Sequence, residues 1–273
     1  MLVSVIITSK NEAEVIDNLI QSLKGQTHKD LEVILIDNNS RDNTVKIVEK
    51  LGIKIYNYGP ERSAQRNFGA KKTKGRFLFF LDADMKLSPT VVEECVKTSI
   101  SDKKIGAVFV PERSVAANFW EKVKAFERSF YNEKGDEITD AARFFKREAF
   151  EKSGGYDETI TGPEDWELTG SIKALGYKTG RIRSVIYHYE RIDSLISLVR
   201  KKFYYGLRSH RYLSKQNVPV ISPKTIYFLR PVFYKHFDRI IAHPILSTGM
   251  FIMLTMELFA GGSGYLIGKA KRL

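Results

Sequence analysis

Short apolar runs alternate with amphipathic stretches along the first 110 residues of the chain. Runs rich in β-branched and aromatic residues predict strands over residues 2–7, 31–36, 53–56, 76–81 and 107–110. Apolar residues at helical spacing predict helices over residues 12–23, 44–51, 63–72 and 89–99. This alternation is typical of an α/β fold with a mostly parallel sheet flanked by helices. In such a sheet the ligand crevice lies at the carboxyl ends of the strands.

The pattern changes near residue 191, where the alternation of strands and helices ends. Apolar residues are interleaved with Lys and Arg over residues 195–215, which predicts a basic amphipathic helix suited to an anionic membrane surface. We therefore expect a first domain at residues 1–190 and a helical, membrane-associating tail at residues 191–273.

The most apolar part of this tail is the stretch 244–268, in which Glu257 is the only charged residue. It is about as long as a bilayer crossing requires. Glu257 and the Gly-Gly-Ser-Gly run at residues 261–264 favour a re-entrant or hairpin arrangement over a single crossing. The alternative is that the tail packs on the first domain or on a second copy of the chain, as in a homo-oligomer.

Composition and charge narrow the class of protein. With 273 residues, 43% of them hydrophobic, the chain can bury an ample core. The net charge of +12 favours anionic partners such as nucleotides, nucleic acid or an anionic membrane. The single cysteine, Cys95, excludes an internal disulfide, and its apolar surroundings predict a buried thiol. The N-terminus reads as a strand and not as a signal peptide, so we expect the first domain at the cytoplasmic face of the membrane.

Candidate chemistry lies where the predicted strands end. Asp82 and Asp84 follow an apolar run, and carboxylates at this edge of a sheet suit Mn²⁺ or Mg²⁺ together with substrate phosphates. A solvated turn is the alternative. Asp37 ends the second strand and could accept a hydrogen bond from a nucleotide. Arg62 and Arg66 are four residues apart on one helical face and suit a diphosphate, although either could be an ordinary surface arginine.

Five segments in register resemble the inverting glycosyltransferase family 2, which has the GT-A fold. They are residues 8–12 (Thr-Ser-Lys-Asn-Glu), 37–44 (Asp-Asn-Asn-Ser-Arg-Asp-Asn-Thr), 64–69 (Ala-Gln-Arg-Asn-Phe-Gly), 82–84 (Asp-Ala-Asp) and 164–168 (Glu-Asp-Trp-Glu-Leu). The resemblance covers about residues 2–190, including Gly-Gly-Tyr-Asp-Glu at 154–158 and Gly-Tyr-Lys at 176–178. It implies a hexosyltransferase that uses a nucleotide-sugar donor.

The resemblance also implies roles for individual residues. Thr8, Glu12 and Asp37 would line the nucleoside pocket, and Arg62 or Arg66 would approach the donor. Within the segment Asp82, Ala83 and Asp84, the first aspartate would face the ribose or the metal and the last would bind the metal. His188 is a further candidate metal ligand, with a structural or surface histidine as the alternative. Asp165, between Glu164 and Trp166 on the acceptor side, would be the general base.

Members of the family with such tails often act on cell-surface or lipid-linked glycans, so the expected acceptor is a glycan or a polyprenyl-phosphate-linked sugar. Two other readings stay open. A sugar nucleotidyltransferase would carry a Gly-rich loop after the first strand, where this chain has none. A nucleic-acid- or glycan-binding protein without catalysis would fit the positive charge, but no nucleic-acid-binding motif is present, so we expect no nucleic-acid partner.

Overall fold

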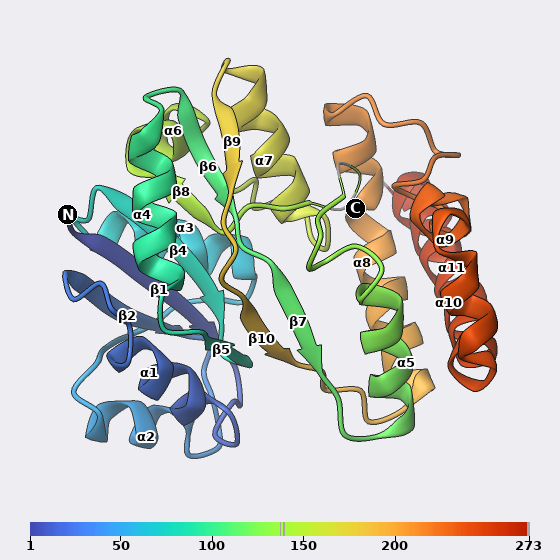
Figure 1. The fold of residues 1–273 in the computed structure, drawn as a ribbon, viewed down its shortest axis with the longest axis horizontal. Helices are drawn as coiled ribbons and strands as arrows, with labels where there is room; N and C mark the ends of the chain where they lie inside the picture. The colour runs from blue at the N-terminus through green and yellow to red at the C-terminus, as the bar shows by residue number, and fades with distance from the viewer. Residues whose placement is uncertain (137, 139, 272–273) are drawn as a thin grey trace. The chain divides into compact units, whose positions relative to one another are not determined.

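The computed structural model describes residues 1–136, 138 and 140–271, which form two compact units (Figure 1). Unit 1 comprises Met1–Glu112, Ala141–Glu158 and Glu164–His188. Unit 2 comprises Arg113–Asp140, Thr159–Pro163 and Tyr189–Leu273. The division predicted at residue 190 remains a prediction; the structure groups two earlier segments with the C-terminal one.

Unit 1 is built on a seven-stranded sheet of order β3-β2-β1-β4-β8-β6-β9. The strands are β1 (Val3–Ser9), β2 (Leu31–Asp37), β3 (Lys54–Asn57), β4 (Phe77–Asp82), β6 (Ile105–Phe109), β8 (Phe144–Lys146) and β9 (Lys178–Arg181). All neighbouring pairs are parallel except the two that β8 makes with β4 and β6. The predicted α/β fold with a mostly parallel sheet is confirmed.

Helices cover both faces of this sheet because alternate side chains of each strand point to opposite sides. The helices are α1 (Ile16–Lys24), α2 (Thr44–Lys50), α3 (Arg62–Lys72), α4 (Val91–Ser101), α6 (Arg147–Lys152) and α7 (Glu164–Ala174). On one face Val5 and Ile7 of β1 pack with Leu19 of α1. On the other, Ile6 of β1 shares a core with Leu168 of α7.

The register of the central strands brings their polar ends together. Thr8 of β1 is paired with Asp82 of β4, and Ser9 of β1 with Asp37 of β2. These residues therefore lie side by side at the carboxyl edge of the sheet, where a parallel sheet opens its crevice.

A second, three-stranded sheet has the order β5-β10-β7. Its strands are β5 (Met85–Leu87), β10 (Ile186–Tyr189) and β7 (Glu112–Val115). β5 follows the Asp82–Asp84 turn directly, and His188 of β10 is paired with Met85. The antiparallel pairing of β5 and β10 thus brings His188 back to the segment that carries the two aspartates.

Unit 2 is helical. Its helices are α5 (Phe119–Arg128), α8 (Leu195–Lys215), α9 (Pro231–Lys235), α10 (Phe237–Ala242) and α11 (Pro244–Lys271), with a single 3₁₀ turn at Tyr227–Leu229. Val123 and Phe126 of α5 share a buried core with Met250, Met253 and Leu254 of α11. Helix α5 therefore belongs with the C-terminal helices, although it ends at Arg128 and the last segment of unit 2 begins only at Tyr189.

Helix α11 is continuous from Pro244 to Lys271 and is long and apolar enough to cross a membrane. The Gly-Gly-Ser-Gly run does not break it, and Gly264 of this run, like Gly268 after it, serves close packing. A Cβ at Gly264 would lie 2.3 Å from the carbonyl oxygen of Phe203 in α8, and one at Gly268 would lie 1.8 Å from that of Leu207. The hairpin expected at this point is therefore absent from the described helix, whose small residues let α8 approach its backbone.

The charge in this helix is neutralised inside unit 2. Glu257 is buried and accepts a hydrogen bond from Lys124 of α5, with an Nζ–Oε1 distance of 3.3 Å. The Nζ atom of Lys202 in α8 lies 3.4 Å from the other carboxylate oxygen. Glu257 thus links α11 to both neighbouring helices.

Candidate active site

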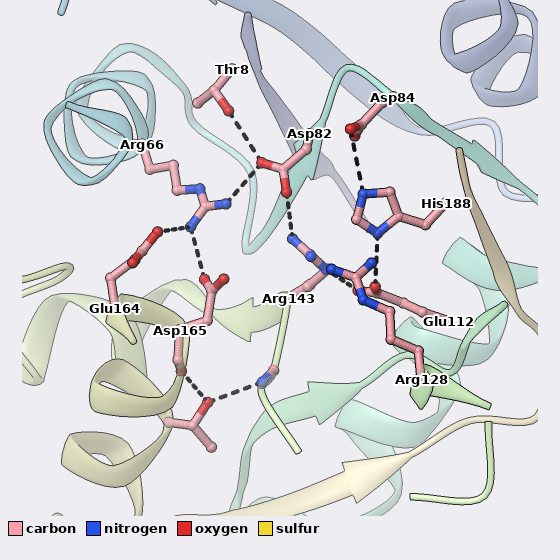
Figure 2. Close-up of polar contacts among 12 residues, drawn as sticks. Thr8, Arg66, Asp82, Asp84, Glu112, Arg128, Arg143, Glu164, Asp165 and His188 are labelled. Carbon is pink, nitrogen blue, oxygen red and sulfur yellow. Dashed lines mark hydrogen bonds and ion pairs between the residues drawn. The ribbon is translucent and has the colours of Figure 1, made fainter. Parts of the chain in front are cut away.

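Asp82 ends β4 and is held by two arginines (Figure 2). Its Oδ1 accepts a hydrogen bond from Arg66 Nη2 at 2.9 Å and a long one from Thr8 Oγ1 at 3.4 Å. Its Oδ2 accepts a hydrogen bond from Arg143 Nη1 at 3.3 Å. Burial alone would raise the pKa of Asp82, but the positive charges of Arg66 and Arg143 hold that pKa well below its usual range. Asp82 is therefore an anion whose oxygens are directed at cations of the chain itself.

Arg66 occupies the centre of the site, and its side chain is fully buried. It lies on α3, and its Nη1 donates to Asp165 Oδ1 at 2.8 Å. Burial of the guanidinium is unfavourable, but the charges of Asp165 and Asp82 offset it, and they raise the pKa of Arg66. Because one guanidinium contacts both carboxylates, it fixes Asp82 at the end of β4 relative to Asp165 at the start of α7 (Figure 2).

Asp165 is held through one carboxylate oxygen. Besides Arg66, Oδ1 accepts a hydrogen bond from the Tyr156 hydroxyl at 3.1 Å. Asn67 positions Tyr156 by hydrogen-bonding both its backbone N–H and its carbonyl, at 2.9 and 2.8 Å. In the described part of the chain no hydrogen bond reaches Oδ2 of Asp165, whose side chain is 21% exposed. That oxygen is available to a ligand.

Arg62, one helical turn before Arg66, has a different environment. Its Nη2 atom lies 2.7 Å from Oε1 of Glu164, which is buried, while the Arg62 side chain itself is 38% exposed. The predicted i, i+4 pair therefore does share one helical face. Of the two arginines, Arg62 has the surface that a bound molecule can reach.

Asp84 and His188 form the second half of the site. The Asp84 Oδ2 and His188 Nε2 atoms are 3.4 Å apart, and His188 Nδ1 lies 3.3 Å from Glu112 Oε2. The other oxygen of Asp84 is buried and has no hydrogen-bond partner among the described residues. A carboxylate with an unsatisfied oxygen beside an imidazole nitrogen fits a divalent cation.

The three predicted metal ligands do not converge. Asp82 faces the arginines, and within residues 1–136, 138 and 140–271 no three His, Cys, Asp or Glu side chains form a ready-made metal cage. Among the described residues, Asp84 and His188 are the two predicted ligands in direct contact, and the metal-binding role of Asp82 stays a prediction. A site with so few protein ligands is typical of Mg²⁺ or Mn²⁺ bound together with substrate phosphates.

The predicted nucleoside-side residues lie at the ends of β1 and β2. Asp37 is buried; its Oδ1 accepts hydrogen bonds from the hydroxyls of Ser9 at 2.7 Å and Ser40 at 2.6 Å. The Glu12 backbone N–H donates to the Thr44 hydroxyl at 2.7 Å. Asp37 thus already shapes the turn after β2.

The remaining predicted residues have simple positions. Ala83 is buried between the two aspartates of the turn, and Trp166 is half-buried on the first turn of α7, next to Asp165.

Three polar residues of the site were not predicted. Arg143 bridges Asp82 and Glu112, its Nε lying 2.5 Å from Glu112 Oε1, and Tyr156 contacts the carboxylate of Asp165. Glu112 follows the predicted strand 107–110 and Pro111, so the rule for strand ends could have indicated it. Arg143 and Tyr156 had no comparable signal, because β8 was not predicted and Tyr156 lies in a loop.

Comparison with known proteins places this geometry in a family. Residues 4–154 match the model of glycosyl transferase family 2. A chondroitin synthase of Pasteurella multocida is 25% identical over 202 residues, which are 68% of this chain and 20% of that protein. A GalNAc(5)-diNAcBac-PP-undecaprenol beta-1,3-glucosyltransferase of Campylobacter jejuni is 35% identical over 92 residues, 31% of this chain and 30% of the relative. The chain thus matches less than a third of either relative's length.

Among solved structures, the mannosyltransferase PcManGT from Pyrobaculum calidifontis, in complex with GDP-Man and Mn²⁺, has a TM-score of 0.60 and 18% identity. The alignment covers 99% of this chain and 79% of that one. This likeness supports the fold, and the family model matches more than half of the chain. The chain therefore belongs to glycosyltransferase family 2.

Proposed function

We propose that the chain transfers a sugar from a nucleotide-diphosphate-sugar donor to an acceptor hydroxyl, with inversion of configuration, at a membrane surface. The observation that carries this proposal is the two-part site. Asp84 and His188 lie together on one side, and Asp165, with one oxygen unoccupied, is fixed on the other through Arg66 and Asp82.

Asp84 and His188 would hold Mn²⁺ or Mg²⁺ on the donor side. The bound ion would neutralise the diphosphate and so make it a better leaving group. Glu112, at 3.3 Å from Nδ1 of His188, would fix the ring so that Nε2 faces the ion. Bound GDP-Man and Mn²⁺ in the similar mannosyltransferase structure support a donor of this class.

The nucleoside of the donor would lie along the edge formed by Thr8, Glu12 and Asp37. Arg62 is the better of the two arginines for contacting the diphosphate, because Arg66 is fully buried. The negative charge of the diphosphate suits the guanidinium of Arg62, whose side chain is 38% exposed.

Asp165 would act as general base on the acceptor side, near Glu164 and Trp166. Its Oδ2 would take the proton of the attacking hydroxyl while the acceptor oxygen bonds to the anomeric carbon. The bond from that carbon to the diphosphate oxygen breaks in the same displacement. The leaving group departs on the face opposite the attack, so a single step inverts the configuration.

Arg66 would position both halves of the reaction. Its guanidinium binds Asp82 and Asp165 at 2.9 and 2.8 Å, and it carries no exposed surface with which to bind substrate. It would therefore act by holding the two carboxylates in place. Because they are already positioned, little reorganisation is needed when the donor binds.

A glycan or polyprenyl-phosphate-linked acceptor on the cytoplasmic face fits the C-terminal segment best. The segment is basic, it contains one helix apolar enough to enter a membrane, and the Campylobacter relative is named for an undecaprenol-linked substrate. Manganese and magnesium are both compatible with the ligands present.

Thermal stabilisation by UDP, GDP, CDP, TDP and ATP, each with and without Mn²⁺, tests the donor site. A ligand that prefers the folded state raises the melting temperature, so one diphosphate should give a shift that requires the metal. The anomeric configuration of the product, read by NMR, then tests inversion. Failure of every nucleotide to stabilise the protein would contradict the proposal and favour a binding protein without catalysis.

A further inference from the structure

Unit 2 exposes a long apolar face, which we call the α10–α11 face. Exposed apolar side chains recur every six or seven residues along α11, mostly as neighbouring pairs, and two more lie on α10. The members are Phe237, Ile241, Ile245, Phe251, Ile252, Leu258, Phe259, Leu266 and Ile267. From Ile245 to Ile267 the row is roughly 33 Å long at 1.5 Å per residue. Between Ile245 and Ile267 the one charged residue, Glu257, is buried on the other side of the helix.

The other side of α11 is already occupied within unit 2. Gly264 and Gly268 lie against the backbone of α8, and Met253 and Leu254 pack into the core shared with α5. Helix α11 is therefore apolar on two sides, and packing inside the unit accounts for only one of them. An exposed apolar surface of this extent is expected to meet another apolar phase.

The contacts of Glu257 argue against a helix that crosses the bilayer. Glu257 is bound to Lys124 and Lys202, so α5 and α8 would have to enter the hydrocarbon together with α11. Arg200 and Lys201, two positions and one position before Lys202 on α8, are exposed. Exposed basic side chains in the hydrocarbon are strongly disfavoured, whereas at the headgroup level they are not.

Charge favours a lipid surface over another protein. Residues 191–273 contain 14 Lys and Arg against three Asp and Glu, which gives almost all of the chain's excess of +12. A basic segment beside a long apolar face is complementary to an anionic bilayer, in which headgroups attract the cations and acyl chains receive the apolar side chains.

We propose that the α10–α11 face lies in the plane of an anionic bilayer, with its apolar side chains at the boundary of the acyl chains, so that the protein is bound to one leaflet and does not span the membrane. This deepens the membrane-surface part of the proposed function. Donor binding at Asp84 and His188 does not depend on it.

Flotation of the full chain with sealed vesicles tests the surface. The protein should float with vesicles containing one quarter phosphatidylglycerol and much less with phosphatidylcholine alone. Replacing the two exposed phenylalanines of α11, Phe251→Ser with Phe259→Ser, should lower the partition coefficient about 100-fold, because each change removes most of the free energy gained when the side chain enters the apolar phase.

The matched control is Ile100→Ser with Leu175→Ser, which removes two exposed apolar side chains from unit 1 and should leave partition unchanged. The metal-dependent shift in melting temperature with nucleotide should survive in both double variants, which separates lost membrane binding from a lost donor site. Equal flotation of the Phe251 and Phe259 variant and the natural chain would overturn the proposal. So would a natural chain that ignores vesicles and dimerises through this face.

Single-cysteine labelling tests the in-plane orientation. The native Cys95 is buried, so Ala242→Cys and Ala270→Cys place one reactive thiol at either end of the apolar stretch. In inverted membrane vesicles from the expressing cells, a membrane-impermeant maleimide should label both positions at the same rate. Labelling of one position only after detergent is added would show a crossing helix and overturn the orientation.

Discussion

Asp165 is bound through Oδ1 alone, and this asymmetry makes its role testable at the level of one atom. Asp165→Asn keeps a carbonyl oxygen that can accept from Arg66 and Tyr156, but it removes the base. Transfer should fall by about 10²- to 10⁴-fold, while metal-dependent nucleotide binding is retained. Steady-state kinetics and the thermal shift with nucleotide measure the two effects.

A matched control for this variant is Glu148→Gln, which removes a carboxylate paired with Lys152 on the exposed side of α6. It should leave turnover unchanged. Turnover of the Asp165 variant at the natural rate would remove this residue from the mechanism.

Glu112 illustrates a second residue-scale effect, because it contacts the ring of His188 on the side away from Asp84. Glu112→Gln should weaken Mn²⁺ binding in the presence of nucleotide by about 10- to 100-fold, as expected when the partner of a metal-binding histidine is lost. Calorimetric titration with Mn²⁺ measures the affinity directly. Glu133→Gln, which breaks an exposed pair with Arg113, is the control; an equal loss in both variants would contradict the role of Glu112.

Asp82 should make stability depend on pH in a defined direction. Its pKa is lowered well below the ordinary value, to which it returns when the chain unfolds. Its ion pairs therefore stabilise the fold fully above about pH 4 and cease to do so as the pH falls through the lowered pKa. The difference in melting temperature between the natural chain and Asp82→Asn should be constant from pH 5 to 7 and shrink in stronger acid. A difference that grows in acid would contradict this assignment.

The site could be predicted from sequence where its residues lie at either end of a strand or helix. Asp82 and Asp84 follow a buried strand, and Asp165 begins a helix, so local pattern locates them. Arg143 and Tyr156 reach the site through the antiparallel insertion of β8 and through a loop clamped by Asn67. Such pairings depend on residues far apart in the chain, and no local pattern encodes them.

At the scale of elements, helices α8 and α11 can pack closely because glycines of α11 carry no side chain at their contact. Gly268→Ala would place a methyl group 1.8 Å from the carbonyl oxygen of Leu207, so the helices must separate. We expect a loss of about 1–3 kcal/mol in the free energy of unfolding, as for overpacked cores. Chemical denaturation of the full chain in detergent or lipid measures it.

Gly262→Ala is the matched control, because a Cβ there meets nothing within 4 Å. Helix propensity predicts a gain of about 0.5–1 kcal/mol for that change. If both glycine variants were equally stable, close packing would not be the reason for Gly268.

At the same scale, the periodic elements of unit 1 were predicted and several short strands were not. The predicted strand 31–36 is observed as β2, Leu31–Asp37, and the predicted helix 63–72 as α3, Arg62–Lys72. Strands β5 and β8 have three residues each, too few to show a period. The glycines of α11 were misread as a break because their role depends on α8, which lies elsewhere in the sequence.

At the scale of the whole molecule, unit 2 combines separate segments of the chain, so a truncation at the C-terminal side also affects helix α5. Helix α5 packs its apolar residues against α11, and Lys124 of α5 is paired with Glu257. Deleting residues 195–273 should therefore leave an aggregating protein, because it exposes Val123 and Phe126 and leaves buried charges unpaired. Size-exclusion chromatography measures the outcome, with deletion of residues 270–273 as the control. A monomeric truncated protein with natural donor binding would show that unit 1 folds independently of these helices.

The order of synthesis gives the α5–α11 contact a further consequence. Helix α5 ends at Arg128 and α11 begins at Pro244. A ribosome adding about 5–20 residues per second needs roughly 6–23 s to make the intervening chain. During that interval the apolar side of α5 has no partner from α11 and is a substrate for chaperones or for the nearby lipid surface. Helix α11 thus completes a part of unit 2 that was made much earlier, and a premature stop codon before Pro244 should release an aggregation-prone, degradable chain in place of a shortened enzyme.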